Sequence, residues 1–157
     1  MKIHTLDWQL WLPAPIDTVF PFFANARNLD LLTPASLHFR ILNPGPITMA
    51  AGTRIAYRIK VRGIPMRWES EITVWEPQTR FVDDQIRGPY RYWSHDHRFD
   101  KRDGGTDVTD RVSYAVPGGT LANFLFVARN LRNIFEYRRQ KLIEIFAKQA
   151  QRLPGLP

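Results

Sequence analysis

The sequence predicts an α+β fold in which one curved antiparallel sheet of about six to seven strands wraps around a long C-terminal helix. The apolar period is two from residue 53 to residue 116, and it becomes 3.6 from residue 121 to about residue 150. The 157 residues, 44% hydrophobic and 24% charged, suffice for one well-buried core. We therefore expect a single domain over residues 1–152 and a flexible tail over residues 153–157.

The first part of the chain combines a strand with short helices. Residues 3–12 alternate as a strand, and Pro15 favours the start of a helix immediately afterwards. The apolar residues of that helix follow at helical spacing: Ile16, Val19, Phe20 and Phe23. A second short helix is expected over residues 26–32, and a short strand over residues 39–43.

The middle of the chain predicts a sheet with one polar and one apolar face. Ile55, Tyr57, Ile59 and Val61 alternate with basic residues along the strand over residues 53–62. In the next strand the apolar face is expected to carry Met66, Trp68, Ile72 and Val74. Three further strands are expected over residues 80–87, 90–102 and 106–116, separated by glycine-containing turns.

The C-terminal segment predicts one amphipathic helix, about 45 Å long at 1.5 Å per residue. Its apolar stripe comprises Phe124, Ala128, Leu131, Phe135, Leu142 and Phe146. A single helix seldom fills the concave side of a wide sheet, so a cavity is expected between the two.

Composition excludes several classes of function. The chain has no cysteine, so it has no disulfide framework, thiolate metal site or cysteine nucleophile. Glycine-rich phosphate loops, nucleophile elbows and His-Glu-x-x-His motifs are also missing, and we expect no cofactor. We see no secretory signal and no apolar run that could span a bilayer, which predicts a cytoplasmic protein. The net charge of +7 is compatible with nucleic acid, anionic lipid or an acidic small molecule as partner.

Three motifs resemble those of a known superfamily. They are LPAPIDTVF at residues 12–20, GPYRYWSHDHRF at residues 88–99, and GGT at residues 104–106 leading into TDRV at residues 109–112. From Trp8 to Ala150 the chain resembles the START-like helix-grip superfamily, SRPBCC, and in particular its polyketide cyclase/dehydrase-like members. The resemblance implies a pocket for a hydrophobic small molecule beneath the long helix. Some members are cyclases or dehydratases and others are lipid carriers or regulators, so it implies a ligand more strongly than a reaction.

His95 and His97 are the sharpest candidates for chemistry, because residues two apart on a strand share a face. They could be metal ligands, polar or catalytic groups inside an apolar pocket, or residues without a role. A cupin-type metal site would need a glutamate soon after His97 and a later histidine, and both are missing. We therefore expect no metal and take both histidines as candidate catalytic residues.

Arg138 is the second candidate, because helical geometry places it near the middle of the apolar stripe. Its guanidinium could reach solvent, pair with a carboxylate of the sheet, or receive an acidic or carbonyl group of a ligand. Asp83 is the candidate partner on the sheet. The neighbouring Asp84 faces the opposite side, so these two carboxylates cannot share a proton.

The candidate ligand-binding residues are the large side chains on inward strand faces together with the stripe of the long helix. Most of the aromatic residues would serve a plain core equally well. The full set is Tyr57, Trp68, Phe81, Trp93, His95, His97, Phe99, Tyr114, Leu131, Phe135 and Arg138.

Three functions are compatible with these features. The first is a carrier or sensor that binds a lipid- or polyketide-like small molecule without chemistry of its own. The second is a cyclase, dehydratase or isomerase that uses a pocket histidine as general base and no dinucleotide cofactor. The third is binding of the basic surface to an anionic membrane or to nucleic acid. We expect no specific nucleic acid partner, and we leave open a transient membrane contact and the oligomeric state.

Overall fold

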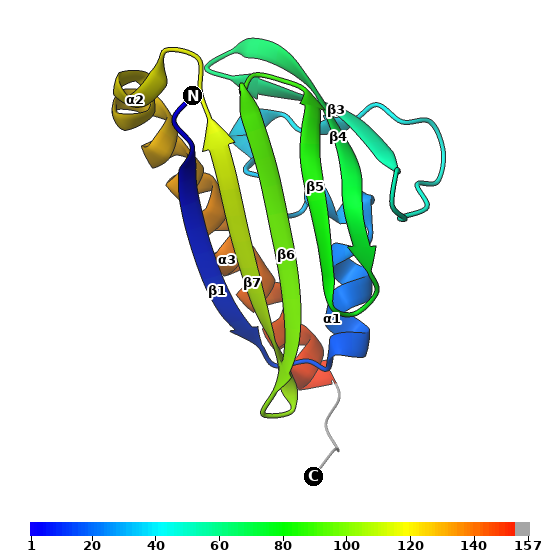
Figure 1. The fold of residues 1–157 in the computed structure, drawn as a ribbon. Coiled ribbons are helices and arrows are strands. Elements are labelled where there is room, and N and C mark those ends of the chain that lie inside the picture. The colour runs from blue at the N-terminus through cyan, green and yellow to red at the C-terminus, as the bar shows by residue number, and fades with distance from the viewer. Residues whose placement is uncertain (153–157) are drawn as a thin grey trace.

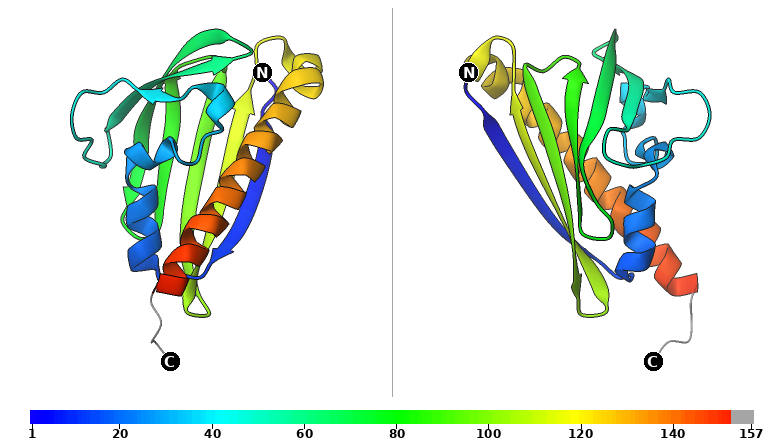
Figure 2. Two further views of the ribbon diagram at one scale, coloured as in Figure 1. Left: turned by 180° about the vertical axis from the view of Figure 1, so that it is seen from behind. Right: turned by 45° about the vertical axis from the view of Figure 1, so that its right-hand side comes forward.

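The structure is a computed structural model, and it describes residues 1–152 apart from the side chain of Phe124. Its architecture is one curved sheet with the long helix α3 (Ala128–Arg152) running along one face, as Figures 1 and 2 show. The predicted tail over residues 153–157 lies outside the described residues, as does the side chain of Phe124, which was assigned to the apolar stripe.

The sheet is antiparallel throughout and has seven strands in the order β1-β7-β6-β5-β4-β3-β2. The fold class predicted from the sequence is thereby confirmed. The strand bounds are β1 His4–Leu12, β2 Arg40–Ile41, β3 Arg54–Val61, β4 Ile64–Glu76, β5 Arg80–Arg87, β6 Tyr92–Arg102 and β7 Gly105–Ala115.

The face of one strand was predicted wrongly. The pairing of β4 with β5 shifts between Ile72 and Val74, where a bulge changes which side chains face inward. Trp75, and not Val74, therefore packs against the core, with its ring centroid 5.4 Å from that of Phe20.

The segment after β1 also differs in part from the prediction. Helix α1 (Ile16–Phe23) is present, and the short helix expected over residues 26–32 is a 3₁₀ helix that ends earlier, η1 (Ala26–Leu29). A further 3₁₀ helix, η2 (Ala35–Leu37), follows it. The Asn25 side chain accepts a hydrogen bond from the Arg27 amide, which favours a tight turn over a regular helix.

The C-terminal helical region begins at α2 (Gly119–Ala122), directly after Gly118 in the left-handed region at φ 83°. A π-helical turn, η3 (Asn123–Val127), joins α2 to α3, where the sequence predicted one uninterrupted helix. Such turns insert an extra residue and often mark functional positions. Among the described residues, no helix has the length and apolarity that crossing a membrane requires.

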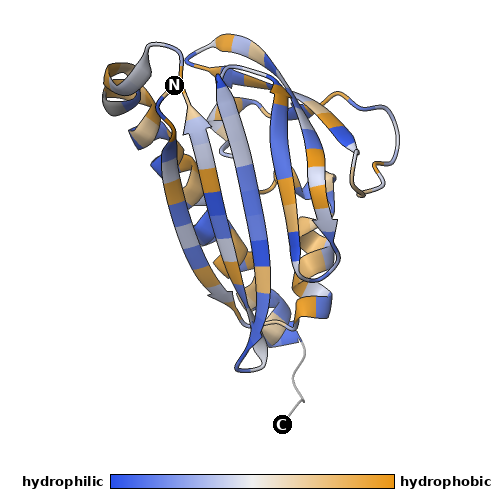
Figure 3. Ribbon diagram, in the orientation of Figure 1, coloured by the Kyte–Doolittle hydropathy of each residue, from blue (hydrophilic) through white to orange (hydrophobic). Residues whose placement is uncertain are grey.

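Two apolar clusters form the core. One gathers around α1 and the C-terminal part of α3, where the rings of Phe22 and Phe146 meet at 5.4 Å. The other includes Trp68, Trp93 and Leu131. Strand β6, in the interior of the sheet, is largely hydrophilic (Figure 3), although His95 and His97 on its inner side are buried. Polar groups are thus enclosed in the middle of the sheet, near the boundary of the two clusters.

Candidate functional site

A cavity of about 830 Å³ lies between the sheet and α3. This volume falls within the range of pockets that enclose a small organic molecule. Apolar and aromatic side chains form most of its wall. Those predicted from the sequence are Tyr57, Trp68, Phe81 and Trp93 from the sheet, and Leu131 and Phe135 from α3.

Phe99 and Tyr114 do not line this cavity, in contrast to the sequence-based assignment. Phe99 packs against α1, with its ring centroid 5.1 Å from that of Phe20 and 5.2 Å from that of Phe23. Tyr114 is fully buried, and its hydroxyl group donates a hydrogen bond to Asn123. Both residues are part of the packing that supports the cavity.

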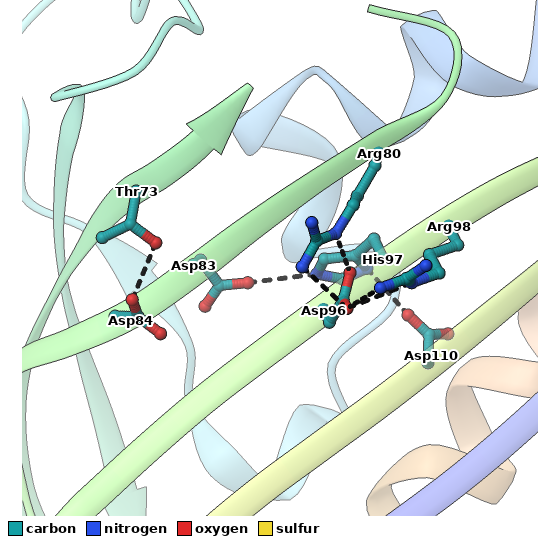
Figure 4. Close-up of polar contacts among 8 residues, drawn as sticks. All are labelled: Thr73, Arg80, Asp83, Asp84, Asp96, His97, Arg98 and Asp110. Atoms are coloured by element: carbon teal, nitrogen blue, oxygen red, sulfur yellow. Dashed lines mark hydrogen bonds and ion pairs between the residues drawn. The ribbon is translucent and has the colours of Figure 1, made fainter. Parts of the chain in front are cut away.

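Four side chains from three adjacent strands form a buried group, which we call the His–Asp cluster: Asp83 of β5, His95 and His97 of β6, and Asp110 of β7. The strand register places Asp83 opposite His95 and His97 opposite Asp110. Figure 4 shows His97 between the two carboxylates, whereas Asp96, the preceding residue, faces the other way toward Arg80 and Arg98. Strand alternation thus separates a polar inner cluster from a solvent-side ion pair.

The contacts within the His–Asp cluster are short and connect all four residues. His95 Nε2 lies 3.0 Å from Asp110 Oδ1, and His97 Nε2 lies 3.0 Å from Asp83 Oδ2. His97 Nδ1 is 2.7 Å from the same Asp110 oxygen, close enough for an ion pair but not aligned for a hydrogen bond. The two imidazole centroids are 3.7 Å apart. Each histidine is therefore held in place by carboxylate groups on neighbouring strands.

The two histidines differ in their affinity for a proton. Burial, reinforced by the charge of the neighbouring His97, lowers the pKa of His95. Burial opposes the charge of His97 as well, but its contacts with Asp110 and Asp83 outweigh burial and raise the pKa of this histidine. We expect His97 to be the charged member of the pair and His95 the neutral one.

Both carboxylates of the cluster remain ionised. Burial acts to raise the pKa of Asp110, but the charge of Arg138, the hydrogen bond from His95 and the ion pair with His97 hold it well below its ordinary value. The pKa of Asp83 is lowered too, because the hydrogen bond from His97 and the charges of the two histidines and Arg138 together outweigh burial. Two carboxylates, one imidazolium and one guanidinium bring the net charge of the region to zero, which lets it persist in a buried place.

Arg138 lines the cavity, but its guanidinium has no hydrogen bond or ion pair with any described residue. Its Nε atom is buried without a partner. The guanidinium carbon lies 5.6 Å from the ring centroid of Phe23 and 6.0 Å from that of Phe135. The ion pair with Asp83, one of the alternatives left open by the sequence, is not formed, and the Asp83 carboxylate accepts a hydrogen bond from His97. A donor remains free to meet a molecule in the cavity.

The sequence analysis did not assign Asp110 to the site. The available signal was the alternation of inward and outward residues along β7. Asp110 lies between Val108 and Val112 on the inward face, and both valines are buried. Ser70 was missed in the same way. It lies on the inner face of β4, lines the cavity and accepts a hydrogen bond from Trp68 Nε1 at 3.0 Å. A polar residue in an inward apolar row is the pattern that identifies both.

A curved antiparallel sheet wrapped around a long C-terminal helix is the START/Bet v1-like helix-grip fold, which the structural neighbours share. A family model described as "Polyketide cyclase / dehydrase and lipid transport" matches residues 12–136, and the chain belongs to this family. The family predicted from the sequence is therefore confirmed. No curated protein matches the chain.

Solved structures show the same fold at low sequence identity. The chain is similar to TTHA0849 from Thermus thermophilus, with 17% identity, a TM-score of 0.73, and coverage of 93% of this chain and 99% of that one. It is also similar to CV1439 from Chromobacterium violaceum, with 14% identity, a TM-score of 0.72, and coverage of 91% of this chain and 97% of that one. Ginseng major latex-like protein 151 from Panax ginseng is similar with 12% identity, a TM-score of 0.67, and coverage of 92% of this chain and 97% of that one.

Proposed function

We propose that the protein binds one hydrophobic or aromatic small molecule, lipid- or polyketide-like in character, and acts as its carrier or sensor. The observation that carries this proposal is the cavity of about 830 Å³, apolar over most of its wall. On one side lie a charged cluster and the Arg138 guanidinium, which has no partner among the described residues. The family to which the chain belongs supports a fold that binds hydrophobic ligands.

Two kinds of contact would hold such a molecule. Burial of its apolar surface against the aromatic wall contributes about 25 cal/mol per Å². Arg138 then supplies a guanidinium that can donate two parallel hydrogen bonds to a carboxylate. The occupant that satisfies both is amphipathic, with an apolar body and an acidic or carbonyl end directed at Arg138.

Native mass spectrometry of the purified protein, compared with its denatured mass, tests the proposal. We expect an excess mass of a few hundred daltons that disappears on denaturation, and extraction of that species would give its chemical class. If no excess mass appears, the stripped protein is titrated with a fluorescent fatty acid. Failure to bind this probe as well, in a correctly folded sample, would contradict the proposal.

A second candidate function is acid–base catalysis on the bound molecule, and the position of His95 and His97 favours it. Both imidazoles line the cavity and both contact a carboxylate, which is the arrangement of a positioned general base. Incubation of the loaded protein in deuterium oxide separates this function from simple carriage. A base would exchange hydrogens at acidic C–H positions of the ligand for deuterium, and the exchange should be lost in His95→Gln, because His95 is the neutral histidine of the pair. A carrier would return the ligand unlabelled.

A further inference from the structure

We propose that Asp83, His95 and His97 form a binding site for a divalent transition-metal ion at the wall of the cavity, with Asp110 orienting the His95 imidazole by a hydrogen bond and contacting that of His97. No metal was expected from the sequence, because the glutamate and the later histidine of a cupin-type site are missing after His97. The third ligand comes instead from the neighbouring strand β5, where Asp83 pairs with His95 in the sheet. This inference concerns the cluster itself and does not depend on which organic molecule fills the cavity.

The three donor atoms converge. Asp83 Oδ2 lies 3.0 Å from His97 Nε2 and 3.8 Å from His95 Nδ1. Each of the three residues offers one ligand atom, and all three atoms lie within 4.8 Å of one another. A metal ion with bonds of about 2.0–2.2 Å places adjacent ligands about 3.0–3.5 Å apart. Small side-chain rotations are therefore enough to complete the site.

Asp110 supplies the second, independent observation. Its Oδ1 atom lies 3.0 Å from His95 Nε2 and 2.7 Å from His97 Nδ1, which are the nitrogens turned away from Asp83. When these two nitrogens carry the protons, the opposite nitrogens present lone pairs on the side of Asp83. A carboxylate behind the imidazoles is the outer-shell arrangement of many histidine-bound metals, where it fixes the tautomer and the ring orientation.

The surroundings define which ions fit. The side chains of His95, His97 and Asp83 are 6%, 4% and 21% exposed, and all three line the cavity. A metal held there keeps coordination positions open to a water molecule or to an oxygen atom of the ligand. Two imidazoles with one carboxylate suit Zn²⁺, Fe²⁺, Co²⁺ or Mn²⁺ better than Ca²⁺ or Mg²⁺. Together, the carboxylates of Asp83 and Asp110 balance the charge of a divalent ion, and Arg138 then favours an anionic ligand beside it.

Metal titration of the full-length protein tests the site. The protein is stripped with a chelator and titrated with Zn²⁺ alone by calorimetry, and with Co²⁺ alone by visible absorption. We expect one ion per chain, a large loss of affinity in His95→Gln and His97→Gln, and a loss of about 10–100-fold in Asp110→Asn. His38→Asn is the matched control, because His38, the exposed residue after η2, has a left-handed backbone that tolerates asparagine. The control should bind as the wild type does.

Two outcomes would overturn the proposal. In the first, the stripped wild-type protein takes up no metal ion. In the second, His38→Asn abolishes metal uptake while His97→Gln leaves it unchanged. If the cluster variants fail to fold, paramagnetic shifts decide the matter in the wild type. Co²⁺ should displace the ring signals of His95 and His97 before those of His4 and His38, and equal displacement of all four would reject the site. Binding of a fatty acid probe to the metal-free protein is measured separately, so either proposal can fail without the other.

Discussion

Tyr114 on β7 donates its hydroxyl hydrogen to Asn123 Oδ1 at 2.9 Å, and both side chains are buried. Asn123 is the first residue of the π-helical turn η3, so this bond attaches the beginning of the C-terminal helical region to the sheet. Burial raises the pKa of Tyr114 even though Asn123 opposes the shift, and the phenol stays a neutral donor. The hydrogen bond between Tyr114 and Asn123 therefore fixes the position of the N-terminal end of α3 relative to the cavity.

Tyr114→Phe should lower the free energy of unfolding by about 1–3 kcal/mol, because it leaves the buried Asn123 oxygen without a donor. Urea denaturation at neutral pH measures the change. Tyr92→Phe is the matched control and should have little effect, since Tyr92 is exposed. In the double variant Tyr114→Phe/Asn123→Leu, loss of both polar partners should recover part of the stability. Additive losses in the double variant would contradict the assigned hydrogen bond.

Arg138→Met should reduce affinity for a fatty acid about tenfold or more while affinity for the matching fatty alcohol changes little. The reason is that a hydrogen bond to a charged group is worth about 1.5–3 kcal/mol, and Arg138 has no competing partner among the described residues. Fluorescence competition with the two ligands measures the difference. Arg129→Met removes the same charge from an exposed position of α3 and serves as the control. An equal loss for acid and alcohol would show that Arg138 acts through packing alone.

Much of the fold could be predicted from the sequence because its strands alternate strongly. Along β3, Ile55, Ile59 and Val61 each follow a basic residue, and only one register places Ile55, Tyr57 and Ile59 on the same side. This apolar side of the sheet must be buried against another element, and the long amphipathic segment that the sequence offers for this is the C-terminal helix. The bulge at Ile72–Val74 could not be predicted, because it depends on how β4 pairs with β5 and not on β4 itself.

The candidate site was predictable only in part. The spacing of His95 and His97 indicated a shared face, but the spacing does not say which residues of other strands lie opposite. Asp83 and Asp110 join the histidines through pairing across β5, β6 and β7. The unpartnered state of Arg138 likewise depends on Asp83 having a better partner in His97. Contacts among side chains of three strands and a helix can be identified only when the strand order is known.

Gly105→Ala should destabilise the β6–β7 hairpin by about 1–3 kcal/mol. A Cβ atom at Gly105 would overlap the carbonyl oxygen of Leu12 and the ring of Trp11. Trp11 cannot easily move aside, because its Nε1 donates a hydrogen bond to the Arg102 carbonyl at 2.9 Å. Thermal denaturation measures the change. Gly104→Asn is the control, since its Cβ meets open space and asparagine tolerates a φ of 73°. Equal melting temperatures for wild type and Gly105→Ala would refute the crowding.

The ion pair of Arg102 with Asp107 should make stability depend on pH on the acid side. Hydrogen bonds from Arg102, one of them 2.8 Å long, hold the pKa of Asp107 below its ordinary value of 3.8. A group with a lowered folded-state pKa stabilises the protein above its unfolded-state pKa, and this contribution is lost as pH falls through the folded-state value. Wild type should therefore have a higher free energy of unfolding than Arg102→Met at pH 7. This difference should be smaller at about pH 3. Arg91→Met, at an exposed position, should show no such convergence.

Ile59→Trp should abolish binding of a long-chain fatty acid with little loss of folding stability. Ile59 lies on β3, is half-buried and lines the cavity, so the larger ring extends into unoccupied space instead of into packed core. Arg58→Trp introduces the same ring one residue earlier, where strand alternation directs it to the exposed face. Titration of both variants with the fluorescent fatty acid, alongside their melting curves, separates the two positions. If Ile59→Trp binds as tightly as Arg58→Trp and both remain folded, the apolar ligand does not occupy this cavity. Loss of binding in Ile59→Trp alone would place the ligand between β3 and α3, within reach of Arg138.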